Sequence, residues 1–241
     1  MSSSADFYNQ DTATRRELFL HNGTPKNDST KWFLELAAAS IADDKTVRVL
    51  DLGTGNGFVP LMLATKYAKQ AAITGVDLAP EMVAMAKEQT KDIAGVTIMQ
   101  CDNYNLPFPA ATFDLVTNKL STHFSIAEVY RVLKPGGSFV FKEYGLGKGI
   151  LEIARLFKGR VVSVDPLTYM KQLRESGFNS YSYQQCSFTA NHTLREVGNI
   201  LASAPIIQNY DERRDIATIQ AALGLTNISL TSDPFIIHGK K

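Results

Sequence analysis

A glycine-rich loop and three acidic positions follow one another along the chain at spacings suited to binding a nucleoside. Asp51 stands just before the run Gly53-Thr54-Gly55-Asn56-Gly57, and Asp77 and the pair Asp102-Asn103 come later. Glycines let a ligand approach the backbone closely, and a carboxylate can accept two hydrogen bonds from a ribose diol. An Asp-Asn pair offers an acceptor and a donor to the amino group and ring nitrogen of an adenine. The order of these residues therefore predicts sites for an amine, a ribose and a base.

The spacing of the glycines separates two classes of cofactor. A dinucleotide fingerprint has the spacing GxGxxG, whereas this loop reads GxGxG and has Phe58 where the third glycine would stand. The negative charge of Asp51 disfavours a pyrophosphate and can hold a cationic amine, directly or through water. The loop therefore favours a zwitterionic amino-acid cofactor over NAD.

The elements that must position these residues alternate between strands and helices. Short apolar runs alternate with helical patterns, which indicates βαβ units on a parallel sheet. The carboxyl ends of such strands share one edge of the sheet, so the loops that follow them come together. The predicted strands are 47–52, 72–76, 96–101, 113–117 and 138–144, with helices after the glycine loop, from Pro80, and from a capping box at Ser125 and Glu128.

The C-terminal part of the chain departs from this simple alternation. We expect a sixth strand at 181–188 and a seventh at 235–238, with an insertion between them that is too long for a hairpin. Capping boxes at Thr193 with Glu196 and at Asn209 with Glu212 predict two helices in it, lying over the sheet edge. The glycine run 145–149 lacks the spacing of a phosphate loop and is interpreted as a mobile hinge.

Composition excludes several classes of protein. The 241 residues carry a formal charge of +1, so there is no excess positive field for a nucleic-acid backbone, and no nucleic-acid partner is expected. The two cysteines have no zinc-site spacing. No leader and no apolar run long enough for a membrane span are recognisable. We therefore expect a cytoplasmic protein that does not bind membranes, as a monomer or a homodimer.

The order of the motifs resembles that of class I S-adenosylmethionine-dependent methyltransferases, over roughly residues 45–145. Within that superfamily it is most similar to the small-molecule branch that includes the ubiquinone and menaquinone biosynthesis methyltransferases. The motifs that carry the resemblance are Val49-Leu50-Asp51-Leu52-Gly53-Thr54-Gly55-Asn56-Gly57, Gly75-Val76-Asp77, Cys101-Asp102, Leu106-Pro107-Phe108, Phe113-Asp114-Leu115-Val116 and Glu128-Val129-Tyr130-Arg131-Val132-Leu133-Lys134-Pro135-Gly136-Gly137.

The resemblance implies a fold, a cofactor and a set of binding residues. The fold is α/β, a Rossmann-like three-layer sandwich with a seven-stranded, mostly parallel sheet whose last strand is antiparallel. The cofactor is S-adenosylmethionine, its product is S-adenosylhomocysteine, and no metal is expected because Asn118-Lys119 supplies no acidic ligand. The residues implied to bind the cofactor are Asp51, Gly53, Thr54, Gly55, Asn56, Gly57, Asp77, Leu78, Met82, Asp102, Asn103 and Asn118.

Two residues are candidates for contact with the acceptor. His123 lies in a short loop before the Ser125 helix, where similar enzymes often place a histidine in the acceptor pocket, and the alternative is a surface histidine. Glu143 ends the fifth strand, where its carboxylate can orient an acceptor hydroxyl or amine; the alternative is a salt bridge with Lys142 or Lys148. A general base is needed only if the acceptor arrives protonated.

The sequence thus predicts a single methyltransferase domain over residues 1–241. It comprises an N-terminal helical cap at 1–45, a cofactor-binding core at 46–145 and a helical lid at 189–227. The expected reaction is in-line transfer of a methyl group to oxygen, carbon or nitrogen of a small-molecule acceptor. The alternatives are a tRNA or protein methyltransferase and a non-catalytic nucleoside-binding module.

Overall fold

The computed structural model describes residues 29–41, 47–67, 71–161, 165–204 and 206–241. Their contacts group them into two compact units. The core unit comprises described residues within 29–143, 166–184 and 236–241, and the insertion unit comprises those within 144–165 and 185–235. The single methyltransferase domain that the sequence predicts over residues 1–241 stays a prediction.

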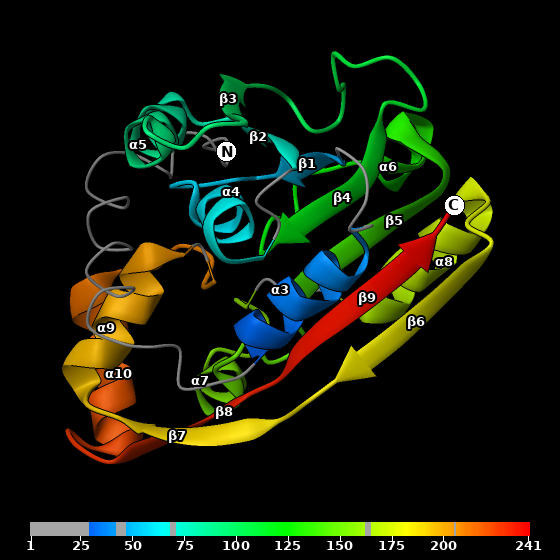
Figure 1. Ribbon diagram of the computed structural model, residues 1–241. Coiled ribbons are helices and arrows are strands. Elements are labelled where there is room, and N and C mark those ends of the chain that lie inside the picture. The colour runs from blue at the N-terminus through cyan, green and yellow to red at the C-terminus, as the bar shows by residue number, and fades with distance from the viewer. Residues whose placement is uncertain (1–28, 42–46, 68–70, 162–164, 205) are drawn as a thin grey trace. The chain divides into compact units, whose positions relative to one another are not determined.

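The core unit is built on a seven-stranded sheet of order β3-β2-β1-β4-β5-β9-β6 (Figure 1). The final strand, β9, runs against its neighbours: the amide of Gly136, at the start of β5, donates to the carbonyl of Lys241, just after β9. This is the mostly parallel sheet with an antiparallel last strand that the sequence predicts. The strands are β1 (Arg48–Leu52), β2 (Ala72–Asp77), β3 (Val96–Gln100), β4 (Phe113–Lys119), β5 (Leu133–Tyr144), β6 (Ser180–Gln185) and β9 (Pro234–Lys240).

The register of the parallel strands sets which residues meet at the carboxyl edge. Asp51 pairs with Gly75 on one side and with Thr117 on the other, and Leu52 pairs with Asn118. Because paired residues of neighbouring strands project to the same face, the side chains of Asp51 and Thr117 share one face. The side chain of Asn118 lies on the opposite face.

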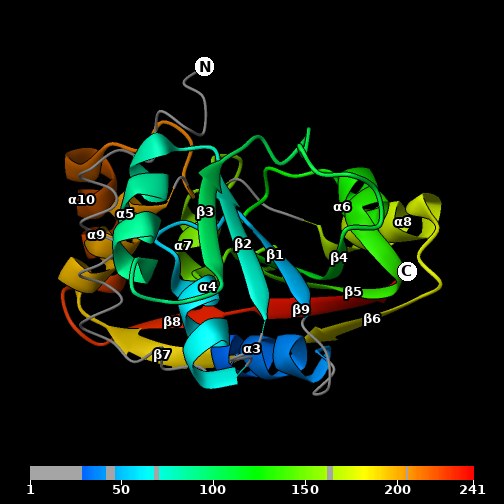
Figure 2. The same ribbon diagram turned by 45° about the horizontal axis from the view of Figure 1, so that its top comes forward.

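Helices cover both faces of the sheet in the core unit (Figure 2). On one face, α3 (Ser29–Ala39) and α4 (Phe58–Met62) bury Phe33, Leu34 and Val59 against strand residues, and α5 (Pro80–Thr90) packs beside α4. A π-helical turn (Leu63–Tyr67) continues α4. On the other face, α6 (Ile126–Val132) contacts α8 (Pro166–Ser176).

The capping box expected at Ser125 is only half formed. The Ser125 hydroxyl accepts a hydrogen bond from the Glu128 amide, which caps α6. The Glu128 carboxylate does not return to the Ser125 amide; it accepts hydrogen bonds from the Leu106 amide and from Arg131. The carboxylate thus bonds to a charged group one turn along the helix and to a backbone amide that is distant in sequence, and both replace the local motif.

The insertion unit contains a second sheet that was not predicted from the sequence. Strands β7 (Phe188–His192) and β8 (Ile228–Ser232) pair antiparallel, and Phe188, predicted to end the sixth strand, opens β7 instead. The alternating residues Ile228 and Leu230 of β8 pack with α7 (Leu151–Leu156), α9 (Leu194–Ser203) and α10 (Glu212–Leu223) around one core. The two helices predicted within the insertion are confirmed.

The caps of these two helices match the prediction in one case and contradict it in the other. Thr193 and Glu196 form the complete capping box of α9. At α10 the N-cap is Asp211 and not Asn209, because Asn209 takes a positive φ of 51° and its carbonyl accepts hydrogen bonds from Arg160 and Arg214. These arginine contacts are not visible in the local sequence.

The glycine run 145–149, interpreted from the sequence as a hinge, is held by one aspartate. The Asp233 carboxylate accepts hydrogen bonds from the amides of Gly147 and Gly149, and its carbonyl accepts one from Gly145. A carboxylate that accepts hydrogen bonds from two backbone amides holds the loop in one conformation, as a bound anion does in an anion-binding turn. The run is therefore an anchored turn.

Helix α10 is tied down by a buried carboxylate. Asp215 is 1% exposed and receives paired hydrogen bonds from Arg160 and from Arg214, together with the amide of Asp211. The bonds from the two guanidinium groups, Arg160 first, hold the pKa of Asp215 far below its usual range. The ion pair is formed above the ordinary titration range of an aspartate and is lost in strong acid.

We predict that Asp215→Asn destabilises the insertion unit by about 3–5 kcal/mol, because it leaves the Arg160 guanidinium without its anion. The measurement is hydrogen–deuterium exchange of the α10 amides together with urea unfolding at pH 7. Arg214→Ala is the matched control: Arg214 is largely exposed, so its loss is expected to cost less than about 1 kcal/mol. A variant Asp215→Asn with wild-type exchange in α10 would contradict the prediction.

Candidate cofactor and acceptor site

Asp51 is a buried carboxylate beneath the start of the glycine loop. It is 1% exposed, its Oδ1 accepts a hydrogen bond of 2.7 Å from the Thr117 hydroxyl, and its Oδ2 is buried without a partner among the described residues. Burial raises the pKa of Asp51 to about 7, and the Thr117 hydrogen bond opposes that rise. An oxygen that lacks a partner in the interior is costly, so this carboxylate is suited to a cationic group nearby.

The three loop glycines differ in what surrounds the position of the missing Cβ. Gly53 takes a φ of 62°, and a Cβ there would lie 2.4 Å from the Cβ of Ser121. Gly57 takes a φ of 86° and packs against Ala86 of α5. Gly55, with a φ of 55°, faces open space: no atom lies within 4 Å of the position of its missing Cβ. Gly55 thus provides the open backbone surface on which a ligand can rest.

Asp77 ends β2 and binds this loop. Its Oδ2 accepts a hydrogen bond of 2.8 Å from the Gly55 amide, and its Oδ1 accepts one of 3.0 Å from the Ala79 amide. Each carboxylate oxygen has a further lone pair. The side chain is therefore oriented by the backbone and retains one acceptor position on each oxygen, which suits the two hydroxyls of a ribose.

Asp102 and Asn103, predicted to contact an adenine, also organise the loop that carries His123. Asp102 Oδ1 accepts the Tyr104 amide at 2.9 Å and lies 3.0 Å from His123 Nε2; the Tyr104 amide, then the His123 contact, lowers the Asp102 pKa. Asn103 is buried, its amide nitrogen donates to the His123 carbonyl, and its Oδ1 has no partner among the described residues. The structure thus connects the predicted adenine residues to the predicted acceptor residue.

Unpartnered buried polar atoms gather at the carboxyl edge of β1 and β4. Asn118 is fully buried; its Oδ1 accepts the Ser121 amide, and its Nδ2 has no partner among the described residues. The Thr54 hydroxyl oxygen is likewise buried without a partner there. Buried polar groups are normally satisfied, so these atoms, with Asp51 Oδ2 and Asn103 Oδ1, indicate that a polar ligand completes the site. The residues present fit an amino-acid nucleoside.

Glu143 lies on the face of the sheet that carries α8 and is 3% exposed. Burial, together with the charge of Glu143, raises the pKa of Tyr169 on α8, so that hydroxyl keeps its proton at neutral pH. The Tyr169 ring stacks on Phe124, with centroids 5.8 Å apart, and meets the Phe141 ring edge-on at 4.7 Å. Glu143 therefore stands beside an aromatic group that also includes the residue after His123.

The remaining predicted cofactor residues lie on the same loops. Asn56 is partly exposed in the glycine loop, and Leu78 is partly exposed after Asp77, with its carbonyl accepting a hydrogen bond from Gln100. Met82 is 2% exposed on α5. These side chains are placed at the carboxyl edge of β1 and β2, and their role in binding stays a prediction.

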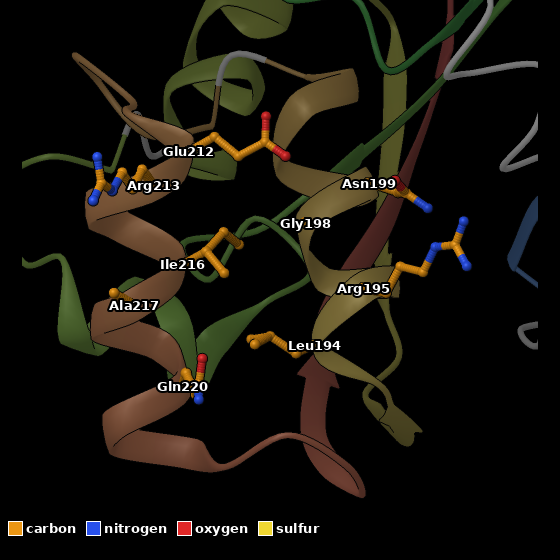
Figure 3. Close-up of a pocket in the computed structure, with 9 residues that line it drawn as sticks. All are labelled: Leu194, Arg195, Gly198, Asn199, Glu212, Arg213, Ile216, Ala217 and Gln220. Atoms are coloured by element: carbon orange, nitrogen blue, oxygen red, sulfur yellow. The ribbon is translucent and has the colours of Figure 1, made fainter.

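A groove of about 580 Å³ in the insertion unit contains none of the predicted site residues (Figure 3). It lies between α9 and α10, where Ile216 and Leu194 point toward the gap.

In the described part of the chain, no group of three or more His, Cys, Asp or Glu side chains is arranged to hold a metal ion. No described helix has the length and apolar character needed to cross a bilayer.

Comparison with known proteins decides the family. A family model described as a methyltransferase domain matches residues 49–137. The chain is 32% identical over 173 residues to a demethylmenaquinone methyltransferase from Thermus thermophilus, covering 68% of this chain and 76% of the relative. The chain belongs to the class I S-adenosylmethionine-dependent methyltransferases.

Two further comparisons place the methyltransferase within that family. It is 33% identical over 187 residues to a ubiquinone/menaquinone biosynthesis C-methyltransferase from Geobacter sulfurreducens, covering 71% of this chain and 70% of the relative. The crystal structure of the YcgJ protein from Bacillus subtilis matches with a TM-score of 0.66 at 22% identity, covering 88% of this chain and 98% of that one. The latter likeness supports the fold, and the former supports the small-molecule branch that the sequence motifs resemble.

Three residues of the methyltransferase site were not identified from the sequence. Thr117 binds Asp51, Ser121 fills the space against Gly53, and Tyr169 joins the aromatic group near Glu143. The motif in the fourth strand ends at Val116, so it did not indicate a role for Thr117. Tyr169 lies on a later helix, outside residues 49–137 that match the family model. Only strand register and helix packing bring these residues to the site.

We predict that the ligand-free methyltransferase loses stability through Asp51 as the pH rises. Its folded-state pKa of about 7 lies above the unfolded value near 4, so the contribution is complete below pH 4 and is lost as the pH rises through 7. Relative to Asp51→Asn, the wild-type free energy of unfolding should be lower by about 2.5 kcal/mol at pH 7.5 than at pH 5.

Urea unfolding at the two pH values measures this difference. Asp92→Asn, on an exposed residue, is the control and should show no such change. If the free energy of unfolding changes equally with pH in the wild type and in Asp51→Asn, the folded protein keeps Asp51 ionised between pH 5 and 7.5. That result would contradict the raised pKa.

Proposed function

We propose that this methyltransferase transfers the methyl group of S-adenosylmethionine to a small aromatic acceptor with an ionisable hydroxyl, of the reduced-quinone or phenol class. The observation that carries the proposal is the relationship to two menaquinone-pathway methyltransferases, each spanning more than two thirds of the relative. The aromatic group of Phe124, Phe141 and Tyr169 beside Glu143 is consistent with a flat acceptor.

In this proposal the carboxyl-edge loops divide the cofactor among them. The open backbone at Gly55 takes the methionine part, and the acidic Asp51 beneath the loop favours its ammonium group. Asp77 accepts hydrogen bonds from the ribose, and Asp102 and Asn103 face the adenine. Bound there, S-adenosylmethionine supplies an electrophilic methyl group on a positively charged sulfur.

The chain's own residues then align the acceptor and manage its proton. The acceptor atom forms a bond to the methyl carbon as the carbon–sulfur bond breaks, and the acceptor proton must leave to a base. His123 is the residue we assign to that role, since Asp102 binds its Nε2 and orients the ring as a carboxylate orients a catalytic histidine. Glu143 is assigned to orienting the acceptor hydroxyl.

We predict that Asp77→Ala weakens the binding of S-adenosylhomocysteine by about 1.5–3 kcal/mol, roughly 10- to 150-fold, the size of hydrogen bonds to a charged group. Isothermal titration calorimetry measures the loss. Because Asp77 also binds the Gly55 and Ala79 amides, the 2′-deoxy analogue of the ligand serves as a control.

The wild type should prefer the ribose form over the 2′-deoxy form, and Asp77→Ala should bind both forms equally. If the variant retains the wild-type preference for the 2′-hydroxyl, Asp77 does not bind the ribose.

A second prediction concerns the acceptor class. With radiolabelled S-adenosylmethionine, the protein should methylate a short-chain demethylmenaquinol in its reduced form, because the hydroxyl makes the ring nucleophilic. The oxidised quinone, a long-chain fatty acid and bulk tRNA should remain unlabelled. Transfer to tRNA or to protein would instead support a macromolecular acceptor, and cofactor binding with no transfer to any of these acceptors would favour a binding module.

A further inference from the structure

We propose that Thr117 is a positioning residue for Asp51, and that Asp51 gives up a proton to solvent when the methyltransferase takes up its positively charged cofactor. The inference rests on the placement of the cofactor over the glycine loop under "Proposed function". Because the proton is released on binding, the relative affinities for the charged cofactor and its less charged product depend on pH.

The geometry leaves Asp51 with one satisfied oxygen and one available oxygen. Thr117 lies opposite Asp51 in the β1–β4 register, and its hydroxyl donates to Oδ1 at 2.7 Å. Oδ2 is buried without a partner among the described residues, so it is the oxygen on which a proton resides when the carboxyl is neutral. Both residues lie under the loop whose backbone is open at Gly55.

Two charged groups from neighbouring strands act on Asp51. Lys119, on β4, favours the ionised carboxyl, and Asp77, on β2, disfavours it. Burial, with the smaller contribution of Asp77, outweighs Lys119 and the hydroxyls of Thr117 and Thr54 and raises the pKa of Asp51 to about 7. A group titrating near neutral pH responds to a new charge placed near it, because a cation favours the ionised form.

The cofactor and the product differ by one positive charge. S-adenosylmethionine carries an ammonium, a carboxylate and a sulfonium, S-adenosylhomocysteine carries the ammonium and the carboxylate, and 5′-methylthioadenosine carries none of these charges. On binding a cation, the neutral carboxyl of Asp51 loses its proton to solvent and becomes a carboxylate, so charge is balanced by one released proton. When the sulfonium charge disappears after transfer and the ammonium remains, Asp51 takes back, on average, part of that proton.

The test is proton release on binding, which requires no acceptor. Isothermal titration at pH 7 in two buffers of different ionisation enthalpy should show release of up to about half a proton for S-adenosylmethionine. Release should be smaller for S-adenosylhomocysteine and absent for 5′-methylthioadenosine. Between pH 6 and 7.5 the ratio of affinities for cofactor over product should rise several-fold, at most about eightfold.

Substitutions test whether the proton release depends on Asp51 and Thr117. Asp51→Asn should abolish the release, while Thr117→Val should raise it at pH 7 and move the affinity change to higher pH, since the carboxyl loses its stabilising donor. Thr117→Ser should restore the wild-type behaviour. Thr112→Val is the matched control, because the buried Thr112 hydroxyl binds the Pro109 carbonyl and should leave the release unchanged.

The outcomes separate the inference from the proposed function. Binding of S-adenosylmethionine without proton release, release that persists in Asp51→Asn, or equal release for all three ligands would overturn the inference and leave the cofactor assignment intact. Binding of none of the three ligands would overturn both.

Discussion

The hydrogen bond from Thr117 to Asp51 joins the two central strands of the sheet at the point where the glycine loop begins. It exists because the β1–β4 register places the residues opposite each other, and it keeps one carboxylate oxygen satisfied in a fully buried position. Burial raises the pKa of this carboxyl to about 7 against the opposing effects of the Thr117 and Thr54 hydroxyls and of Lys119. The charge at the centre of the candidate site thus follows from strand pairing.

Around this pair, each loop at the carboxyl edge has a structural task beside the binding role proposed for it. Asp77 orients the loop through Gly55 and keeps acceptor positions that suit the proposed ribose, and Asp102, proposed to contact the adenine, contacts His123. Sharing a carboxylate between a backbone or side-chain donor and a ligand fixes its orientation before binding. It also means that a substitution at these positions changes the loop as well as the ligand contact, so ligand analogues are needed to separate the two effects.

The motif series predicted the parallel sheet, the loop positions and the family, because strand–loop–helix periodicity and loop spacing are local properties. The features that it missed depend on distant partners. Asn209 is displaced as a cap by arginine contacts, Glu128 accepts a hydrogen bond from the distant Leu106 amide and not from Ser125, and Asp233 anchors the glycine run expected to be a hinge. The roles of Thr117 and Tyr169 likewise arise from register and packing. Of the N-terminal cap predicted over residues 1–45, the parts 1–28 and 42–45 lie outside the described residues.

The most direct measurement of the central claim is a crystal structure of the protein with S-adenosylhomocysteine. We expect density for the ligand at the carboxyl edge of β1 to β4, with the amino-acid part over Gly55, the ribose hydroxyls at Asp77 and the adenine at Asp102 and Asn103. Density elsewhere, or a ribose that does not contact Asp77, would contradict it.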